Sequence, residues 1–528
     1  MSLTSLPTEI LHQVIDDLLP EGLESIALTC KALYQVSSTL FAFHRRMRDR
    51  YEHFSYSKSK SVDGVETWDS RTEASGIKIR HAADLLQRIA EDPRVARYIR
   101  FADFKADASI ASYPSPMETL EGGSVLDRLA ENVAMMRLVR ESTWPYLRDA
   151  GLDPQALPEK LPPVVDTLVL LTMLPNVRQL ALPRYWGSAW DMAAHYNEFL
   201  DGVLGAVLRR ANEADHPHPG ASLSRLSIIA PHQGSGYDTH DALELYDPFL
   251  ALNSLREFYM GSMVAETASA NGASFSPSHD KYSPQLKKIE LVASVMGRPE
   301  WVRLLSRTPN LEILRMSHEN KFEWLGQSWD LGETMNTIQQ VAGKHLRELC
   351  LSASNCWSTG TTLTNMSGFE CLEVLELDVS MLLQTAYEDD GRGGDDTDGE
   401  DMDWMDRLEA LDKEPKHTSC LVDILPASIQ TVRLVGWGHP TPLREYEESF
   451  RAVKTLFRWF ALERPSKLPA LKEISFTRQA ANCMVLPEYK EVLDYLEREG
   501  CTIVDPNACW AIHLKDTFYE RFGVEADY

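Results

Sequence analysis

Two histidine-bearing segments place imidazole and carboxylate groups close together, as a metal site requires. One is "HPHPG", with His216 and His218. The other, "PHQGSGYDTHD", has four possible ligands, namely His232, Asp238, His240 and Asp241. Both segments are rich in Gly or Pro and lack the helical i, i+4 spacing that brings ligands to one face. We therefore expect loops here and no metal site.

Other catalytic patterns are absent. The eight cysteines, at 30, 350, 356, 371, 420, 483, 501 and 509, form no CxxC pair, and the chain has no GxxxxGK[ST], GxSxG or HExxH motif. "GRGG" at 391–394 lies in an acidic segment, not between a strand and a helix, so it does not indicate a dinucleotide site. No motif therefore names a catalytic activity, and we expect no cofactor.

The acidic segment "EDDGRGGDDTDGEDMDWMD" spans 388–406 and resembles a calcium loop only superficially. With Gly399 as the sixth loop position, Gly394 falls where the first Asp ligand belongs. So charged an insertion cannot bury itself, and we expect it to be disordered. Thr397, followed by acids, is a possible kinase site, although a solvated loop is the simpler interpretation.

Charge and hydropathy limit the partners. The formal net charge is −25, which argues against nucleic-acid binding, and the cluster "HRRMRDR" at 44–50 suits a solvated helix face. No apolar run reaches the roughly 18 residues of a membrane span, and no signal-peptide pattern begins the chain. We expect a protein of the cytoplasm or nucleus, with no membrane partner.

Three short helices are expected at the N-terminus. Pro7 suits a first helical position, and apolar residues from Ile10 to Leu19 form a wide stripe. Spacing predicts a second helix from Leu23 to Leu33 and a third from about Thr39. About 45 residues bury too little surface to be stable alone, so these helices should dock on a partner or on the rest of the chain.

Residues 49–76 are expected to form a linker or exposed loop because their composition turns polar after Ser55. A helix should follow, and then a short strand in "RVARYIRFADF" with Ile99 and Phe101 facing inward.

An apolar–x–x–apolar–x–apolar pattern recurs nine times over 77–528, and such a hexad is typical of the strand of a leucine-rich repeat. The hexads are "VRQLAL", "LSRLSI", "LREFYM", "LKKIEL", "LEILRM", "LRELCL", "LEVLEL", "IQTVRL" and "LKEISF". Their spacing of 25 to 57 residues exceeds the usual 20 to 29 or so, which leaves room for helices and insertions. We predict an α/β fold, an irregular leucine-rich-repeat solenoid with parallel strands on its concave face; the alternative is a doubly wound α/β protein.

The pattern at 3–48 closely resembles the F-box, a three-helix module. "LPxEIL" from Leu6, "LLP" from Leu18 and "LxCKxLY" from Leu28 stand at F-box spacing, with Thr29 where the family usually has an apolar residue. An F-box followed by irregular repeats resembles the fungal F-box/leucine-rich-repeat group. The resemblance implies docking on the Skp adaptor of a cullin–RING ubiquitin ligase through Leu6, Pro7, Glu9, Ile10, Leu11, Ile15, Leu28, Cys30 and Lys31. Of these, Leu28 and Cys30 could equally belong to the module's own core.

The repeats are expected to bind an unidentified protein substrate. Side chains that alternate with the buried ones should face the concave surface, and these are Ser227, Tyr259, Glu290, Arg315, Cys350, Glu376 and Arg433. Tryptophans shortly after strands could anchor a partner at one rim, or pack in the core; these are Trp186, Trp324, Trp357 and Trp437.

Three functions fit these patterns. The first is a substrate-recognition subunit of a Skp–cullin–F-box (SCF) ligase, and the second is a Skp-binding scaffold that recruits no cullin. The third is a repeat protein whose N-terminal helices only cap the solenoid. The polar stretch 55–76 speaks against the third, because it should separate the helices from the first strand.

Overall fold

The computed structural model describes the chain in two compact units. The first comprises Met1–Gly234, Asp241–Gly261 and Ser276–Leu286, and the second Ser235–His240, Ser262–Phe275 and Lys287–Tyr528. The residues described are 3–56, 59–62, 65–68, 79–107, 133–152, 164–184, 186, 197–213, 221–232, 241–265, 280–319, 331–354, 365–378, 382, 420–435, 453–477, 487–504, 518 and 520–522.

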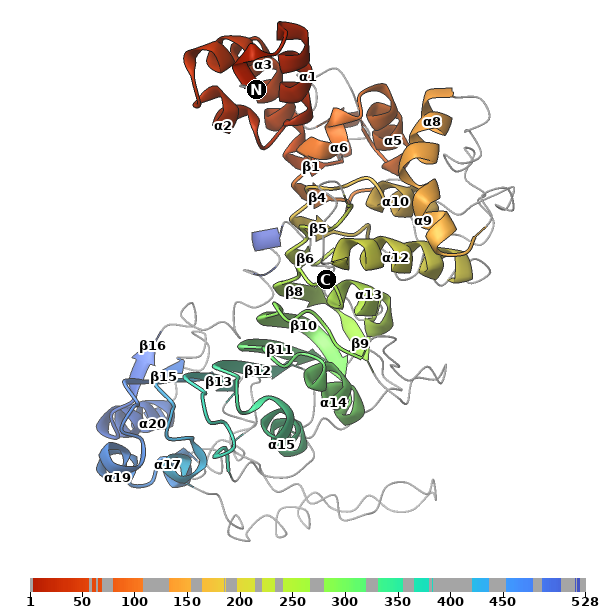
Figure 1. Cartoon of the computed structure of the whole chain (residues 1–528). Coiled ribbons are helices and arrows are strands. Elements are labelled where there is room, and N and C mark those ends of the chain that lie inside the picture. The colour runs from red at the N-terminus through yellow and green to blue at the C-terminus, as the bar shows by residue number, and fades with distance from the viewer. Residues whose placement is uncertain are drawn as a thin grey trace, which may run out of the picture. The chain divides into compact units, whose positions relative to one another are not determined.

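The first unit starts with helices, namely a 3₁₀ turn at Leu3–Ser5, α1 (Thr8–Asp17), α2 (Leu23–Ala27) and α3 (Lys31–Tyr51). Its parallel strands follow in the order β1 (His53–Ser55), β4 (Phe101–Asp103), β5 (Gln179–Ala181), β6 (Ile228–Ala230) and β8 (Glu257–Gly261). Figure 1 shows helices along one face of these strands. They include α5 (Ala82–Glu91), α6 (Arg94–Tyr98), α8 (Val133–Ser142), α9 (Trp144–Asp149), α10 (Val164–Leu171), α12 (Asn197–Asn212) and α13 (Asp247–Leu250).

Four smaller elements also belong to the first unit. Strands β2 (Ser59–Val62) and β3 (Val65–Trp68) form a separate antiparallel pair. The short β7 (Asp241–Ala242) leads into a 3₁₀ turn at Leu243–Tyr246.

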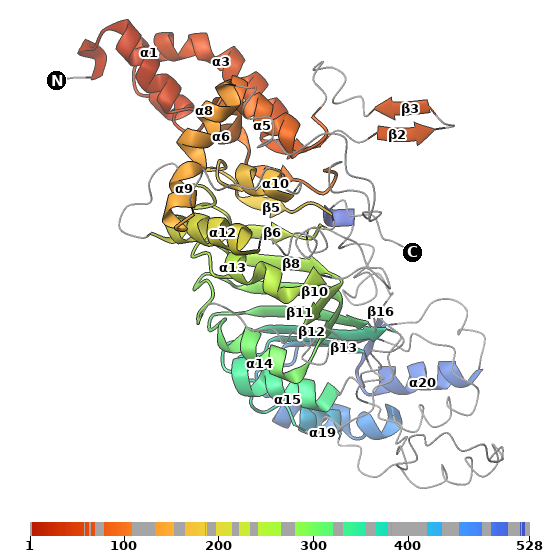
Figure 2. The same ribbon diagram turned by 90° about the vertical axis from the view of Figure 1, so that its right-hand side faces the viewer.

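The second unit repeats the same alternation. Its parallel strands run β10 (Lys288–Met296), β11 (Ile313–Glu319), β12 (Glu348–Ser354), β13 (Val374–Asp378), β14 (Thr431–Val435), β15 (Glu473–Thr477) and β16 (Thr502–Val504), with β9 (Met263–Ala265) beside β10. Helices α14 (Arg298–Ser306) and α15 (Leu331–Ala342) follow β10 and β11 (Figure 2). The remaining helices are α17 (Leu421–Ile424), α19 (Phe460–Lys467) and α20 (Pro487–Arg498).

In-register apolar side chains hold each sheet together. In the first unit Phe54, Ala102, Leu180, Ile229 and Phe258 lie side by side, and all are buried. In the second unit the matching buried row is Ile289, Leu314, Leu349, Leu375, Val432 and Ile474. Each of the nine predicted hexads overlaps a strand, "LSRLSI" only at Ile228, and the predicted α/β class with parallel strands is confirmed.

Four sequence predictions need correction. The predicted second helix ends at Ala27, because Cys30 is extended, and α3 begins at Lys31 instead of near Thr39. The expected linker 49–76 contains regular structure, since α3 runs to Tyr51, β1 lies at 53–55, and β2 and β3 also lie within it. The polar stretch therefore does not separate the helices from the first strand.

The other two corrections concern which side chains face inward. Because α6 occupies Arg94–Tyr98, the following strand buries Ala102, and Phe101 is partly exposed against the ring of His53. In β6 the register pairs Leu180 with Ile229, not with Leu226.

Candidate partner-binding surfaces

Helices α1, α2 and α3, here called the N-terminal helices, have a small core of their own. It is formed by Leu11, Ile15, Leu19, Leu23, Ile26 and Leu33. Leu6, Val36, Leu40, Phe41 and Phe43 pack around it and remain partly exposed. Leu11 and Ile15, two of the residues implied to dock an adaptor, are therefore structural, and Leu6 lies at the edge of the core.

Several large apolar side chains of these helices are exposed to solvent. The exposed ones are Leu3 (41%), Ile10 (43%), Leu18 (39%), Leu28 (86%) and Tyr34 (52%). Leu28 projects because α2 ends before it: the Thr29 hydroxyl donates to the Ile26 carbonyl and Cys30 turns to extended backbone. Pro7, Glu9, Cys30 and Lys31 are exposed as well. Single exposed apolar residues are ordinary, but several within one small module indicate a contact surface.

The N-terminal helices also contact α6 and Arg100, the residue before β4. Arg94 in α6 forms an ion pair with Asp16 (3.1 Å) and stacks its guanidinium over the ring of Phe43. His44 Nδ1 and the Tyr98 hydroxyl are 2.9 Å apart and buried. The His44–Tyr98 pair is separated by 54 residues and the Asp16–Arg94 pair by 78, so neither could be predicted from local sequence patterns.

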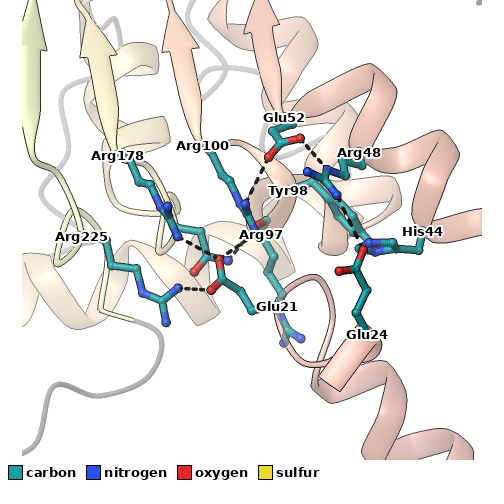
Figure 3. Close-up of polar contacts among 11 residues, drawn as sticks. Glu21, Glu24, His44, Arg48, Glu52, Arg97, Tyr98, Arg100, Arg178 and Arg225 are labelled. Atoms are coloured by element: carbon teal, nitrogen blue, oxygen red, sulfur yellow. Dashed lines mark hydrogen bonds and ion pairs between the residues drawn. The ribbon is translucent and has the colours of Figure 1, made fainter. Parts of the chain in front are cut away.

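Glu21, in the turn between α1 and α2, gathers three arginines (Figure 3). Its Oε1 lies 3.0 Å from Arg100 and 3.7 Å from Arg178, and its Oε2 lies 3.1 Å from Arg225. Glu52 contacts Arg100 (3.1 Å) on one side and Arg48 (2.7 Å) on the other. This cluster was not expected from the sequence; its signal is an arginine one to three residues before β4, β5 and β6.

A polar cavity of about 150 Å³ lies beside this cluster. Its lining residues are Pro20, Glu21, Glu24, His44, Arg48, Glu52, Tyr98 and Arg100. Burial lowers the pKa of His44; Glu24 and Glu52 act against this shift, and Arg48 and Arg100 reinforce it. At neutral pH the imidazole is therefore uncharged.

His44 should make the first unit sensitive to mild acid. Its pKa is lower in the folded than in the unfolded state, so its contribution to stability is present above about pH 6.5 and is lost as the pH falls through the folded pKa. Thermal unfolding of His44→Gln should therefore depend less on pH below 6.5 than that of the wild type. His12→Gln, in α1, is the control; equal slopes for all three proteins would contradict the assignment.

Five of the predicted substrate-binding residues lie side by side in the second unit. The strand register places Glu290, Arg315, Cys350, Glu376 and Arg433 in one row across β10 to β14. Arg315 Nη1 lies 3.0 Å from Glu290 and its Nε donates to Glu348 at 2.6 Å.

Only part of this row is accessible. Glu290, Cys350 and Glu376 are buried, whereas the side chains of Arg315 and Arg433 are 23% and 37% exposed. Burial raises the pKa of the Cys350 thiol, with Glu376 and Glu348 adding to the effect. A partner could therefore reach the guanidinium groups but not the thiol.

The remaining predicted substrate residues are not brought into this row. Tyr259 is buried, and the β6 register puts Ala230, not Ser227, at the predicted position. Trp186 is fully buried, so it packs in the core and is not an exposed anchor. Trp324, Trp357 and Trp437 lie outside the described residues.

Two of the histidine-segment residues meet in the core of the first unit. His232 Nε2 lies 2.7 Å from Asp241 Oδ2, which also accepts a hydrogen bond from the Tyr246 hydroxyl at 2.6 Å. His216, His218, Asp238 and His240 lie outside the described residues. Among the residues that the structure describes, no group of three or more His, Cys, Asp or Glu side chains could hold a metal ion.

The structure and the comparisons with known proteins add two general findings. No helix in the described part of the chain is long and apolar enough to cross a membrane. No model of a known protein family matches the chain, and the search of curated proteins finds no relative.

Proposed function

We propose that this chain is the substrate-recognition subunit of an SCF-type ubiquitin ligase. Its N-terminal helices would act as an F-box that docks on a Skp adaptor. Its parallel strands and helices would form an irregular leucine-rich-repeat solenoid that binds a protein substrate. The chain would perform no catalysis; it would raise the effective concentration of a substrate lysine near a ubiquitin-loaded enzyme.

The exposed apolar side chains of the N-terminal helices carry this proposal. Ile10 and Leu28 belong to the F-box-like pattern, and both lie outside the module's own core. Burying one such side chain in an interface contributes about 1.5–3 kcal/mol. Leu28, at 86% exposure, has almost its whole side chain available for such a contact.

A second function, a plain cap of the sheet, also has an observation in its favour. Helix α3 leads into β1 with one residue between them, and Arg94 and Arg100 tie the helices to α6 and β4. A cap hides the apolar edge of a repeat array. Capping alone does not account for leucine and isoleucine side chains left in solvent.

Coexpression with a Skp adaptor tests the proposal. The wild type should copurify with the adaptor, and Ile10→Ser/Leu28→Ser should weaken binding by about a hundredfold, since two anchors are removed. The matched control is Val302→Ser/Leu462→Ser, which changes two exposed apolar residues of the second unit (41% and 79% exposed). A wild type that stays alone would leave the cap as the function. An adaptor complex that never recruits a cullin would indicate the scaffold.

A further inference from the structure

The residues that immediately precede the strands form a continuous backbone-linked row in each unit, here called the strand-start row. In the first unit the amide of each residue donates to the carbonyl of the one before, in the order Glu52, Arg100, Arg178, Ser227 and Arg256. In the second unit the order is Lys287, Glu312, Arg347, Glu373, Gln430 and Lys472. These side chains therefore follow one another at the strand spacing of about 4.8 Å.

The second unit pairs two of its three cations with acids of the same row. Lys287 pairs with Glu312, Arg347 with Glu373 (3.4 Å), and Lys472 donates to Gln430 (2.7 Å). Lys287 and Arg347 thus each face an acid on the next strand, and only Lys472 has a neutral partner, on the strand before it.

The first unit is built differently. Between Arg100 and Arg256 its row contains no acid, and Arg225 adds a further guanidinium two residues before Ser227. Among the described residues, Glu21 is the only acid within ion-pair distance of Arg178 and Arg225, and it comes from the N-terminal helices rather than from the row. Arg256 has a neutral partner, Gln285.

Three of these arginines are also accessible, whereas the side chain of Arg100 is 22% exposed and contacts both Glu21 and Glu52. The side chains of Arg178 and Arg225 are 49% and 45% exposed, and Arg256 is exposed as well. A patch with an excess of guanidinium groups, in a chain with a formal net charge of −25, marks a local site for an anion. Guanidinium groups bind phosphate and carboxylate oxygens in pairs, which suits this arrangement.

We infer that Arg178, Arg225 and Arg256, with Arg100 at their edge, form a binding surface for an acidic or phosphorylated segment of a partner protein, with Glu21 occupying part of it in the free chain. The four residues span three strand intervals, about 14 Å, which matches four or five residues of an extended peptide. A long nucleic acid would need many phosphate contacts and would be repelled by the rest of this acidic chain.

Under the proposed function this partner is the substrate of the ligase. The inference rests on that function only in calling the partner a substrate. The arginine surface lies at the residues that precede the strands. It does not include Ile10 or Leu28, the apolar residues proposed to contact the adaptor. Adaptor copurification and peptide binding can therefore fail independently.

Fluorescence anisotropy with the full-length chain tests the inference. The probe is a labelled Gly/Ser decapeptide with two phosphoserines, compared with the same peptide containing two Glu or only Ser, and with a ten-nucleotide single strand. We expect the phosphopeptide to bind most tightly and more weakly in high salt. Tighter binding of the oligonucleotide, or no difference between the phosphorylated and Ser peptides, would overturn the inference.

The variants provide the decisive comparison. Arg178→Gln/Arg225→Gln should weaken phosphopeptide binding at least tenfold, whereas Arg347→Gln/Lys472→Gln, with the same charge change in the second unit's row, should alter it less than twofold. If both double variants lost the same affinity, net charge alone would explain the binding, and a specific surface would be refuted. Glu21→Gln should bind severalfold more tightly, because it frees the guanidinium groups; weaker or unchanged binding would show that Glu21 does not occupy the site.

Discussion

Replacing Arg315 by methionine should lower the free energy of unfolding of the second unit by about 3 kcal/mol, because it removes one of the two counter-charges of a buried carboxylate and the partner of a second, partly buried one. Arg315 bridges Glu290 and Glu348, and the side chain of Glu290 is only 2% exposed. Methionine keeps most of the packing of the arginine stem. Lys288, 2.7 Å from Glu290, limits the loss but cannot reach across the strands as Arg315 does.

Urea unfolding of three proteins measures this effect. The double variant Glu290→Gln/Arg315→Met should recover part of the loss, because no buried charge is then unpaired. Arg298→Met is the control: its ion pair with Glu333 is largely exposed and should contribute less than about 1 kcal/mol. Equal destabilisation by Arg315→Met and Arg298→Met would show that burial of the pair does not determine its contribution.

Replacing Asp241 by alanine should destabilise the first unit by about 3 kcal/mol, since two charge-assisted hydrogen bonds are lost from a buried site. Asp241 accepts from Tyr246 and lies 2.7 Å from His232, and all three side chains are buried. Burial and the nearby Asp241 charge raise the pKa of Tyr246 well above its usual value, so its hydroxyl stays protonated and donates.

Tyr246→Phe is the graded comparison for this prediction. It removes one hydrogen bond and should cost about 1–2 kcal/mol, because Asp241 and His232 still contact each other. Amide exchange in β6 and β8, followed alongside urea unfolding, would locate the loss in the first unit. If Asp241→Ala destabilised the protein less than Tyr246→Phe, the Asp241 carboxylate would not be the group that holds both hydrogen bonds together.

The secondary structure was largely predictable from sequence because its signal is local. Strand alternation and helix spacing are set by neighbouring residues, so all nine hexads identify strands. The failures occurred where that signal is ambiguous. Ile228 and Ile229 are both apolar, and only pairing with Leu180 decides which one faces inward. Leu28 continues the helical pattern of α2, but the turn at Thr29 and Cys30 leaves it in solvent.

The sequence by itself determined the α/β class, the strands, the row from Glu290 to Arg433 and the F-box-like pattern at the N-terminus. Only the tertiary structure decided which of those residues are buried and which charges share a partner. Glu21 meets Arg100 across 79 positions because the N-terminal helices pack beside the strand starts. Parallel stacking then adds Arg178 and Arg225 to the same carboxylate. Such contacts depend on how separate elements pack, and no local periodicity encodes that.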